Sequence, residues 1–206
     1  MSQQKRDAEA SRARILAAAR RLFAERDIPA VSIRDIARAA GVSHGLVQQY
    51  FGTREQMLVA IIQSEIEQVT SLSAASLEER PLTLEDTRHT ILAGRSRFHD
   101  FALLITRAQL AGIKPETMLD PAKPTPATTL AETIQELQSH APAQARPLDP
   151  QMVSAYVNAA LIALEIIHPW LMASVGLKPE DYEARFDEVA EITMQLIRLA
   201  AGAEPQ

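Results

Sequence analysis

The sequence contains no cysteine, so a disulfide framework, a thiolate metal site and a cysteine nucleophile are all excluded. Aromatic residues make up only 4% of the chain and runs of β-branched residues are scarce, which favours an all-α protein. The sequence has no glycine-rich phosphate-binding loop, and no two histidines stand four residues apart on a helix. We therefore expect no enzyme, no metal and no cofactor.

A secretory leader and a membrane span are also not expected. The N-terminus is polar and charged through Arg14. The longest apolar stretch, residues 150–177, is interrupted by Glu165, His168 and Pro169. Together with the lack of cysteine, this pattern predicts a cytoplasmic protein that has no membrane partner.

The net charge of −5 hides an asymmetry along the chain. Residues 1–60 hold ten Lys and Arg against six Asp and Glu, a net charge of +4. Residues 61–206 hold eleven against twenty, a net charge of −9. A basic N-terminal part on an acidic body concentrates attraction to phosphate in one place, although a solvated basic surface would have the same composition.

The pattern of residues 32–51 predicts two short helices joined by a tight turn. Ser32 is a good N-cap, and Asp35 completes a capping box with it. Gly41 stands where a positive φ would end the first helix, and Ser43 can cap the second.

The second of these helices is the candidate recognition helix, over residues 44–50. Val47 and Phe51, four residues apart, are expected to face the first helix. Two short helices joined by a turn that contains glycine form the helix-turn-helix arrangement, whose second helix lies in the DNA major groove.

Local signals predict how the neighbouring segments fold. Residues 1–11 are expected to be a disordered arm with Lys5 and Arg6, followed by a helix from about Ser11 to Arg26. Asp27 is expected in the left-handed C′ position, and Pro29 prevents the helix from continuing. A capping box of Thr53 with Gln56 opens a helix towards about Leu77 that begins in the DNA-binding domain and ends in the body.

The body repeats one pattern, in which a cap, an apolar stripe and a Gly or Pro break follow one another. We expect about nine helices in all, with a DNA-binding domain over residues 1–52 and an effector-binding and dimerisation domain over residues 53–206. The expected body helices open at Thr83, Ser96, Thr125, Asp149 and Pro179, with loops over residues 113–124 and 140–150. Pro169 should kink or break its helix.

The last two long helices, over about 150–175 and 179–201, have more apolar surface than a helix with one buried face needs. A self-complementary pair of such helices would bury the excess across a twofold axis and form a homodimer. The alternative is that they only form the core of a monomer.

The order of these elements resembles the tetracycline-repressor (TetR) family. The matching residues, which lie within roughly residues 10–60, are Ser32-x-x-Asp35-Ile36-Ala37, Ala40-Gly41-Val42-Ser43-x-Gly45, Tyr50-Phe51 and Thr53-Arg54-Glu55. The family usually has Gly where this chain has Asp27. It usually has Tyr, which contacts DNA, where this chain has Gln48, so relatives do not predict the operator sequence.

In the helix-turn-helix arrangement, phosphate and base contacts come from different side chains. Phosphate contacts are expected from the N-terminus of the first helix of the helix-turn-helix, from the basic arm and from side chains nearby. The candidates are Ser32, Arg34, Ser43, Tyr50, Arg54, Lys5 and Arg6. An uninvolved arm and a solvated Arg34 remain alternatives. Base contacts are expected from His44, Gly45, Leu46, Gln48 and Gln49, with Gln pairing to adenine and an exposed Leu46 touching a thymine methyl.

The resemblance implies a repressor that a small molecule releases from DNA. The expected effector is largely hydrophobic, and its candidate lining is Phe98, Phe101, Ile105, Met152, Asn158, Leu161, His168 and Trp170. For each polar residue of this set, an ordinary structural role is the alternative. A helix-turn-helix that binds protein instead of DNA, and an activator instead of a repressor, are the alternatives for the function.

Overall fold

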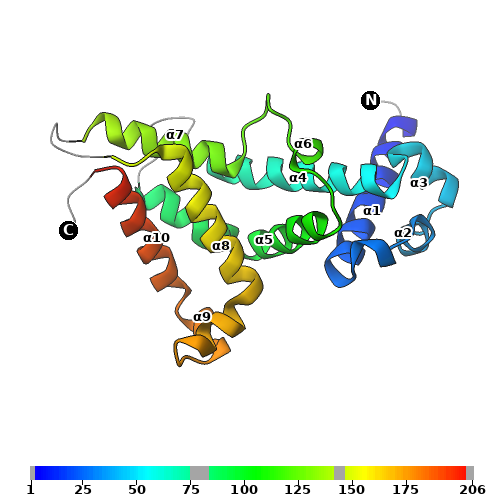
Figure 1. Cartoon of the computed structure of the whole chain (residues 1–206). Helices are drawn as coiled ribbons and strands as arrows, with labels where there is room; N and C mark the ends of the chain where they lie inside the picture. Colours follow the sequence, from blue (N-terminus) through cyan, green and yellow to red (C-terminus); the bar gives the residue numbers. More distant parts are fainter. Residues whose placement is uncertain (1–2, 75–83, 142–146, 203–206) are drawn as a thin grey trace. The chain divides into compact units, whose positions relative to one another are not determined.

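The computed structural model describes residues 3–74, 84–141 and 147–202 (Figure 1). Over these ranges the chain forms ten α-helices and one short 3₁₀ turn, with no strand. The expected all-α fold is therefore confirmed, with one helix more than the nine or so predicted from sequence.

The helices form two compact units. The first unit comprises Met1–Glu65 and Leu103–Lys123, and the second comprises Ile66–Ala102 and Pro124–Gln206. Two helices, α4 (Arg54–Ala74) and α5 (Leu84–Leu110), have residues in both units. The predicted boundary after residue 52 separates an expected DNA-binding domain from an expected effector-binding domain. The compact units instead divide within α4, after Glu65, and within α5, after Ala102.

The first unit holds the predicted helix-turn-helix. Besides the start of α4 and the end of α5, its elements are α1 (Gln3–Glu25), the 3₁₀ turn Ile28–Ala30, α2 (Ile33–Ala40), α3 (His44–Phe51) and α6 (Pro115–Met118). Helix α1 packs against α2, and α2 packs against α3. Their common core contains the fully buried side chains of Ile15, Ala19, Phe23, Ile36, Val47 and Leu58.

The caps predicted around the helix-turn-helix are confirmed. The Asp35 backbone N–H donates to Ser32 Oγ (3.1 Å), and the Ser32 N–H donates to Asp35 Oδ2 (3.2 Å). Gly41 ends α2 with φ 65°, a left-handed conformation that most residues with a Cβ avoid. Ser43 Oγ accepts from the Leu46 N–H (3.2 Å) and so opens α3.

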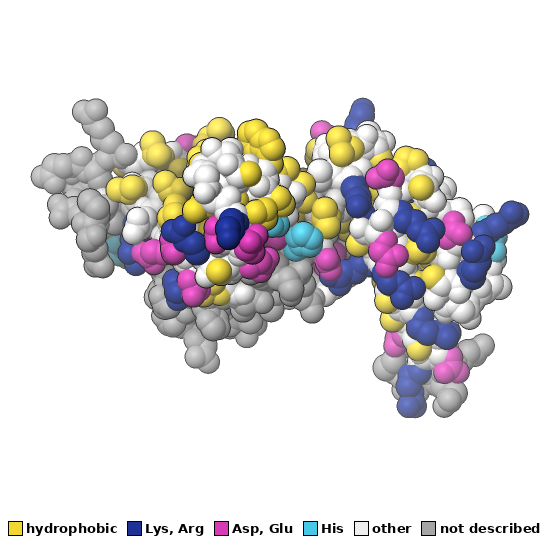
Figure 2. Space-filling model, turned by 90° about the horizontal axis from the view of Figure 1, so that it is seen from below, with side chains coloured by type: hydrophobic (Ala, Val, Ile, Leu, Met, Phe, Trp, Pro, Cys, Tyr) yellow, Lys and Arg dark blue, Asp and Glu magenta, His cyan; other side chains and the backbone are white. Residues whose placement is uncertain are grey.

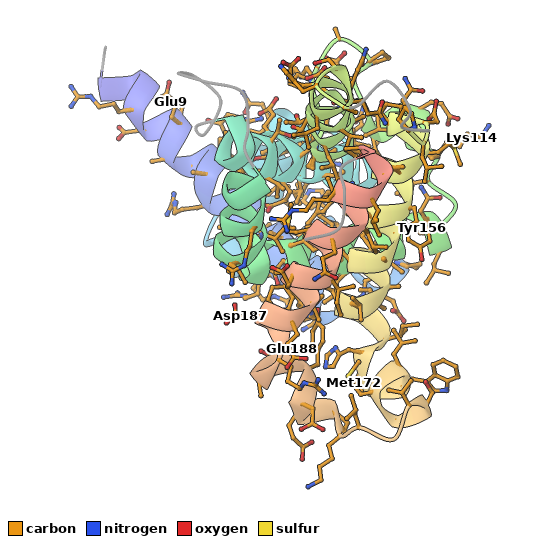
Figure 3. The ribbon with its side chains drawn as sticks, turned by 90° about the vertical axis from the view of Figure 1, so that its left-hand side faces the viewer. Glu9, Lys114, Tyr156, Met172, Asp187 and Glu188 are labelled. Atoms are coloured by element: carbon orange, nitrogen blue, oxygen red, sulfur yellow. The ribbon has the colours of Figure 1, made fainter. Side chains whose placement is uncertain are left out.

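The second unit is a helical body with its own core. Besides the rest of α4 and α5, its elements are α7 (Pro126–Ser139), α8 (Pro150–Ser174), α9 (Pro179–Ala184) and α10 (Phe186–Ala200). The core cluster combines Ile134 of α7 with Val157 of α8 and with Met194 and Ile197 of α10. Figure 3 shows α8 and α10 side by side on the face turned to the viewer.

Helix α8 bends near its end, as predicted. Ile167 has non-helical angles (φ −122°, ψ 17°), two residues before Pro169. Proline has no N–H to donate to the Glu165 carbonyl, and its ring crowds that oxygen. Among the described residues, α8 is the one helix long and apolar enough to cross a membrane. This is weak evidence, because core helices of soluble proteins pass the same test.

Two expectations near the N-terminus are wrong. The arm predicted to be disordered is helical from Gln3 onward, because the segment has good helix formers such as Ala8 and Glu9 and no Gly or Pro. Asp27 is extended (φ −60°, ψ 138°) and not left-handed. It is the N-cap residue of the 3₁₀ turn at Ile28, so the backbone is extended at Asp27 between α1 and that turn.

Three expectations in the body also need correction. The two helices predicted on either side of Gly94 are the single helix α5, because one glycine inside a helix costs only about 1 kcal/mol. The predicted loop 113–124 contains the short α6. The predicted helix 179–201 divides at Arg185 (φ −116°, ψ 21°), whose guanidinium pairs with both carboxylate oxygens of Glu188. The predicted cap at Thr83 and helix end near Leu77 lie outside the described residues.

Candidate nucleic-acid interface

Helix α3 has one buried face and one exposed polar face. Val47 and Phe51 are buried against the rest of the first unit, as predicted. The opposite face consists of exposed residues, which are His44, Gly45, Gln48 and Gln49. Leu46 is half-buried, so it is only partly available for the predicted methyl contact. A Cβ built at Gly45 would meet nothing within 4 Å, so no packing contact inside the protein requires glycine there.

The N-terminus of α2 offers backbone donors to an anion. The Ser32–Asp35 capping box satisfies the Asp35 N–H, whereas the N–H groups of Ile33 and Arg34, at the first two helical positions, have no partner inside the helix. Free N–H groups and the helix dipole both favour a phosphate at this position. The Ser32 hydroxyl itself donates to Asp35, so at this helix end the backbone is the better donor.

The capping box also lowers the pKa of Asp35 below its ordinary value of 3.8. The main cause is the side-chain hydrogen bond from Ser32, followed by the Ser32 backbone N–H and, more weakly, by the charges of Arg38 and Arg26. Because the folded-state pKa is depressed, the stabilisation is present above the unfolded pKa and is lost as the pH falls through the folded one.

We expect Asp35→Asn to reduce the acid sensitivity of the first unit. Between about pH 5 and about pH 3 the melting temperature of the unchanged chain should fall more steeply than that of the variant. Thermal unfolding followed at several pH values measures this difference. Glu25→Gln, which removes an exposed charge at the end of α1, is the matched control and should keep the slope of the unchanged chain. Equal slopes for Asp35→Asn and the unchanged chain would contradict the assignment.

The turn into α4 depends on Gly52. Its angles (φ 66°, ψ −115°) are open only to glycine, and a Cβ there would lie 2.1 Å from Gln56 Oε1. That oxygen accepts from the Thr53 N–H (2.8 Å), while Thr53 Oγ1 accepts from the Gln56 N–H (3.1 Å). The predicted capping box is thus confirmed, and it explains a glycine that the sequence pattern did not single out.

Arg54, a predicted phosphate contact, already has partners within the protein. Its guanidinium donates to Glu55 Oε1 (2.9 and 3.2 Å) and to the Pro29 carbonyl oxygen (3.1 Å). The hydrogen bond from Arg54 helps to lower the pKa of Glu55, after a bond from the backbone N–H of Glu55 itself. Contact with a phosphate would therefore compete with Glu55 for the same N–H groups.

The other predicted phosphate contacts lie on the surface of the first unit. Arg34 and Arg6 are exposed, Tyr50 is half-buried with its ring centroid 6.3 Å from that of Phe51, and the side chain of Lys5 is not described. Arg12 of α1 lies 5.2 Å above the Phe51 ring. Figure 2 shows Lys and Arg side chains spread over the part of the molecule that holds α1 to α3.

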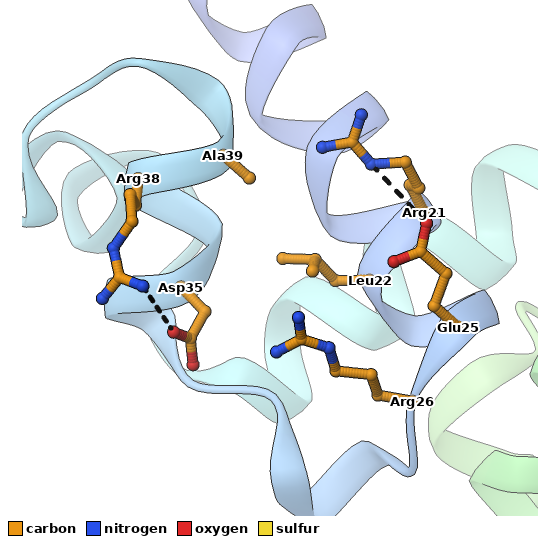
Figure 4. Close-up of a pocket in the computed structure, with 7 residues that line it drawn as sticks. All are labelled: Arg21, Leu22, Glu25, Arg26, Asp35, Arg38 and Ala39. Atoms are coloured by element: carbon orange, nitrogen blue, oxygen red, sulfur yellow. Dashed lines mark ion pairs between the residues drawn. The ribbon is translucent and has the colours of Figure 1, made fainter.

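A charged hollow between α1 and α2 was not predicted from the sequence. Its volume is about 390 Å³, and its lining is Arg21, Leu22, Glu25, Arg26, Asp35, Arg38 and Ala39. Figure 4 shows the pairs Arg38–Asp35 (3.6 Å) and Arg21–Glu25 (3.9 Å) at its edges, with Arg26 reaching between the two helices. A second, more apolar hollow of about 520 Å³ lies between the start of α4 and the segment after α5.

The predicted effector-lining residues are distributed over both units. Ile105 belongs to the first unit and the other seven to the second. In the second unit, Phe101 is buried and Phe98 is half-buried, with ring centroids 6.2 Å apart. Met152 and Trp170 are exposed to 69% and 70%. The set as a whole stays a prediction.

The remaining candidates already have contacts inside the second unit. Leu161 packs against the core cluster, and Asn158 Nδ2 donates to the Ser154 carbonyl oxygen (2.9 Å). His168 stacks on Tyr182 with ring centroids 4.5 Å apart. Its Nδ1 is buried without a hydrogen-bond partner.

Next to His168 lies a buried polar cluster that sequence reasoning missed. Glu165 is only 6% exposed, and its carboxylate accepts from the Tyr182 hydroxyl (2.8 Å) and faces His99 Nδ1 (3.0 Å). The signal in the sequence was a charged residue inside the apolar segment 150–177, which we interpreted only as evidence against a membrane span. Its partners are 17 and 66 residues away along the chain.

The helix-turn-helix region matches a known family. Residues 15–61 fit the family described as bacterial regulatory proteins, tetR family. This segment is similar to the TetR family. Within residues 15–61 lie α2, α3 and the start of α4, so the match covers the exposed polar face of α3 and the caps around it.

The curated relatives that the chain matches in part are named as transcriptional regulators. The HTH-type transcriptional repressor Rv3405c of Mycobacterium tuberculosis is 54% identical over 50 residues, which are 24% of this chain and 27% of that protein. The chain therefore spans only about a quarter of the length of the first curated relatives that it matches. These relatives are named as transcriptional regulators and not as enzymes.

Solved structures resemble this chain over nearly its whole length. The regulator PfmR of Thermus thermophilus superposes with a TM-score of 0.61 at 22% identity, covering 93% of this chain and all of that one. A structure described as a gamma-butyrolactone receptor (ArpA like protein) gives a TM-score of 0.60 at 20% identity, covering 92% and 98%. At these identities the likeness shows the shared fold.

Proposed function

We propose that this chain is a TetR-family, ligand-responsive transcriptional regulator, acting in the cytoplasm, that binds a near-palindromic DNA operator as a homodimer. The observation that supports it most is the exposed polar face of α3. His44, Gln48 and Gln49 point away from a helix whose other face is buried. The open space at Gly45 favours close approach by a molecule outside the protein.

Two groups of residues would divide the work of DNA binding. The N–H groups at the start of α2, together with Ser32, Arg34, Ser43, Tyr50 and Arg54, would hold phosphates without regard to sequence. The exposed face of α3, which is His44, Gly45, Gln48 and Gln49 with the half-buried Leu46, would read base edges.

We expect Gln48→Ala to relax the choice of operator, because a bidentate Gln–adenine pair contributes about 1–3 kcal/mol of discrimination. Arg54→Ala should instead weaken binding to every duplex, because its contact carries no sequence information. Affinities of both variants for a selected and a random duplex measure the difference. Equal losses of affinity on both duplexes for both variants would contradict this division.

The dimer surface proposed here lies on α8 and α10. Each of these helices contributes core residues on one side and large exposed apolar residues on another, which are Met152, Tyr156, Ile192, Leu196 and Leu199. Figure 3 labels Tyr156, which is 65% exposed, on this face. Large exposed apolar residues on two neighbouring helices are typical of an interface, and a twofold axis would let two copies cover each other.

The regulation is proposed from the relatives and from the second unit. One matched relative is named a repressor, and one protein of the same fold is described as a receptor for gamma-butyrolactone. A small, largely hydrophobic molecule among the predicted lining residues would release this chain from DNA by binding better to the form that does not fit the operator.

Salt dependence of binding tests whether the partner is DNA. The affinity of the purified chain for a duplex should fall steeply with salt, with a log–log slope of about −0.9 for each neutralised phosphate. A helix-turn-helix that binds protein would show no such slope and no affinity for duplexes. A flat or absent response to salt would therefore remove DNA binding from the proposal.

A further inference from the structure

Arg107, near the end of α5, donates hydrogen bonds to the C-terminal end of α1. Its guanidinium donates to the carbonyl oxygens of Phe23 (2.6 Å) and Ala24, and more weakly to that of Arg26 (3.4 Å). All of these residues belong to the first unit, and the Arg107 side chain is half-buried there.

These acceptors are the groups that a helix leaves without partners at its C-terminus. The last four carbonyls of an α-helix have no intrahelical donor, and the negative end of the helix dipole attracts a cation. In α1 the Leu22 carbonyl still accepts from the Arg26 N–H (3.0 Å). The Phe23 and Ala24 carbonyls, which follow it, are satisfied by Arg107, so one side chain 83 or 84 residues away completes the helix end.

A second arginine, from another helix, donates to the same segment, residues 23–29, where the chain turns from α1 towards α2. Arg54, in the first turn of α4, donates to the carbonyl oxygen of Pro29 (3.1 Å). Pro29 lies in the 3₁₀ turn that joins α1 to α2, and Ser32, three residues later, begins the capping box of α2. The corner over residues 23–29 is therefore fixed by one guanidinium from α5 and one from α4.

Helices α4 and α5 are the two helices that have residues in both compact units. We propose that Arg107, with Arg54, is a positioning residue for DNA binding that sets the orientation of α2 and α3 through the corner at residues 23–29. This positioning role rests on the proposed DNA-binding function, whereas the hydrogen bonds from Arg107 and Arg54 to residues 23–29 do not.

Arg107→Met tests the positioning role, because methionine keeps an unbranched stem and removes all the donors. We expect its affinity for a duplex selected on the unchanged chain to fall about tenfold, which is what losing one charge-assisted hydrogen bond would cause. Arg107→Lys keeps the charge and can still donate to the carbonyls, so it should recover most of the affinity. Amide exchange should become faster at residues 24–30 in Arg107→Met and stay unchanged in α7 and α10.

A stability control separates positioning from general weakening. Ile15→Ala removes a fully buried side chain from the core of the first unit and leaves the hydrogen bonds of Arg107 and Arg54 in place. At an equal drop in melting temperature, Arg107→Met should lose more duplex affinity than Ile15→Ala, and equal losses would overturn the proposal. Unchanged affinity of Arg107→Met would overturn it as well.

Two further results keep the test decisive. If Arg107→Met does not fold, Arg54→Met removes the hydrogen bond to Pro29 from the half-buried start of α4, and unchanged duplex affinity of that variant would equally overturn the proposal. If the unchanged chain binds no duplex at all, the proposed function fails. The exchange rates at residues 24–30 then still decide whether Arg107 holds the corner.

Discussion

Leu196→Glu is expected to split the dimer and to lower operator affinity on the order of 100-fold or more. Leu196 lies on the exposed apolar face of α10, between Ile192 and Leu199. A charge buried there without a partner costs about 3–5 kcal/mol, and the proposed twofold axis would place two such charges in one interface. A single subunit would also lose the second half-site contact that makes binding bivalent. Sedimentation or light scattering measures the mass, and titration of the selected duplex measures the affinity.

Gln135→Glu is the matched control for this variant. It places the same charge on an exposed position of α7, outside the apolar face of α8 and α10. This control should remain dimeric and should bind DNA as the unchanged chain does. A Leu196→Glu protein that kept its dimer mass would show that the interface lies elsewhere, and the exposed apolar face would then need another explanation.

Ile36→Ala is expected to destabilise the first unit by about 2–5 kcal/mol, the cost of emptying a fully buried aliphatic site. Ile36 is 0% exposed in the core that α1, α2 and α3 share. Because this core is small, the helix-turn-helix should unfold locally before the second unit does. Circular dichroism on heating should show an early partial loss of helix, and duplex affinity should fall over the same temperature range.

Ile33→Ala provides the comparison for Ile36→Ala on the same helix. It makes the same chemical change at the first position of α2, where the side chain is only half-buried. Both variants have the same gain in helix propensity, so their difference reports burial. Ile33→Ala should lose less than half as much stability as Ile36→Ala, and equal losses would contradict the packing of Ile36 described above.

The helix-turn-helix could be predicted from sequence because its signals are local. The caps at Ser32, Ser43 and Thr53 each involve a partner three residues away, and the left-handed turn at Gly41 needs only the glycine itself. Residue order therefore contains all the information that these features require, and the recognition helix follows from them.

The errors arose where local signals compete. Gly94 suggested a helix break, but the helix formers on both sides outweigh the cost of one glycine and α5 runs through it. Polar character suggested a disordered N-terminal arm, whereas charged residues without Gly or Pro can also extend a helix from Gln3. In both cases the sequence shows the helix-favouring and helix-breaking residues but does not show which effect is larger.

The long-range part of the interface could not be predicted at all. The guanidinium of Arg107 donates to carbonyl oxygens more than 80 residues away, a contact that the sequence pattern did not predict. Arg54 was expected to face phosphate, and in the structure it contacts Pro29 and Glu55. Such contacts depend on how helices pack, which periodicity alone does not determine.

Selection of bound genomic fragments by the purified chain tests DNA recognition by α3 most directly. It should enrich a near-palindrome whose two half-sites are centred about 34–36 Å apart, or a multiple of one helical turn. The same selection with His44, Gln48 and Gln49 all replaced by alanine should lose that sequence. If no sequence is enriched, or if the triple variant enriches the same sequence as the unchanged chain, recognition of DNA bases by α3 would be contradicted.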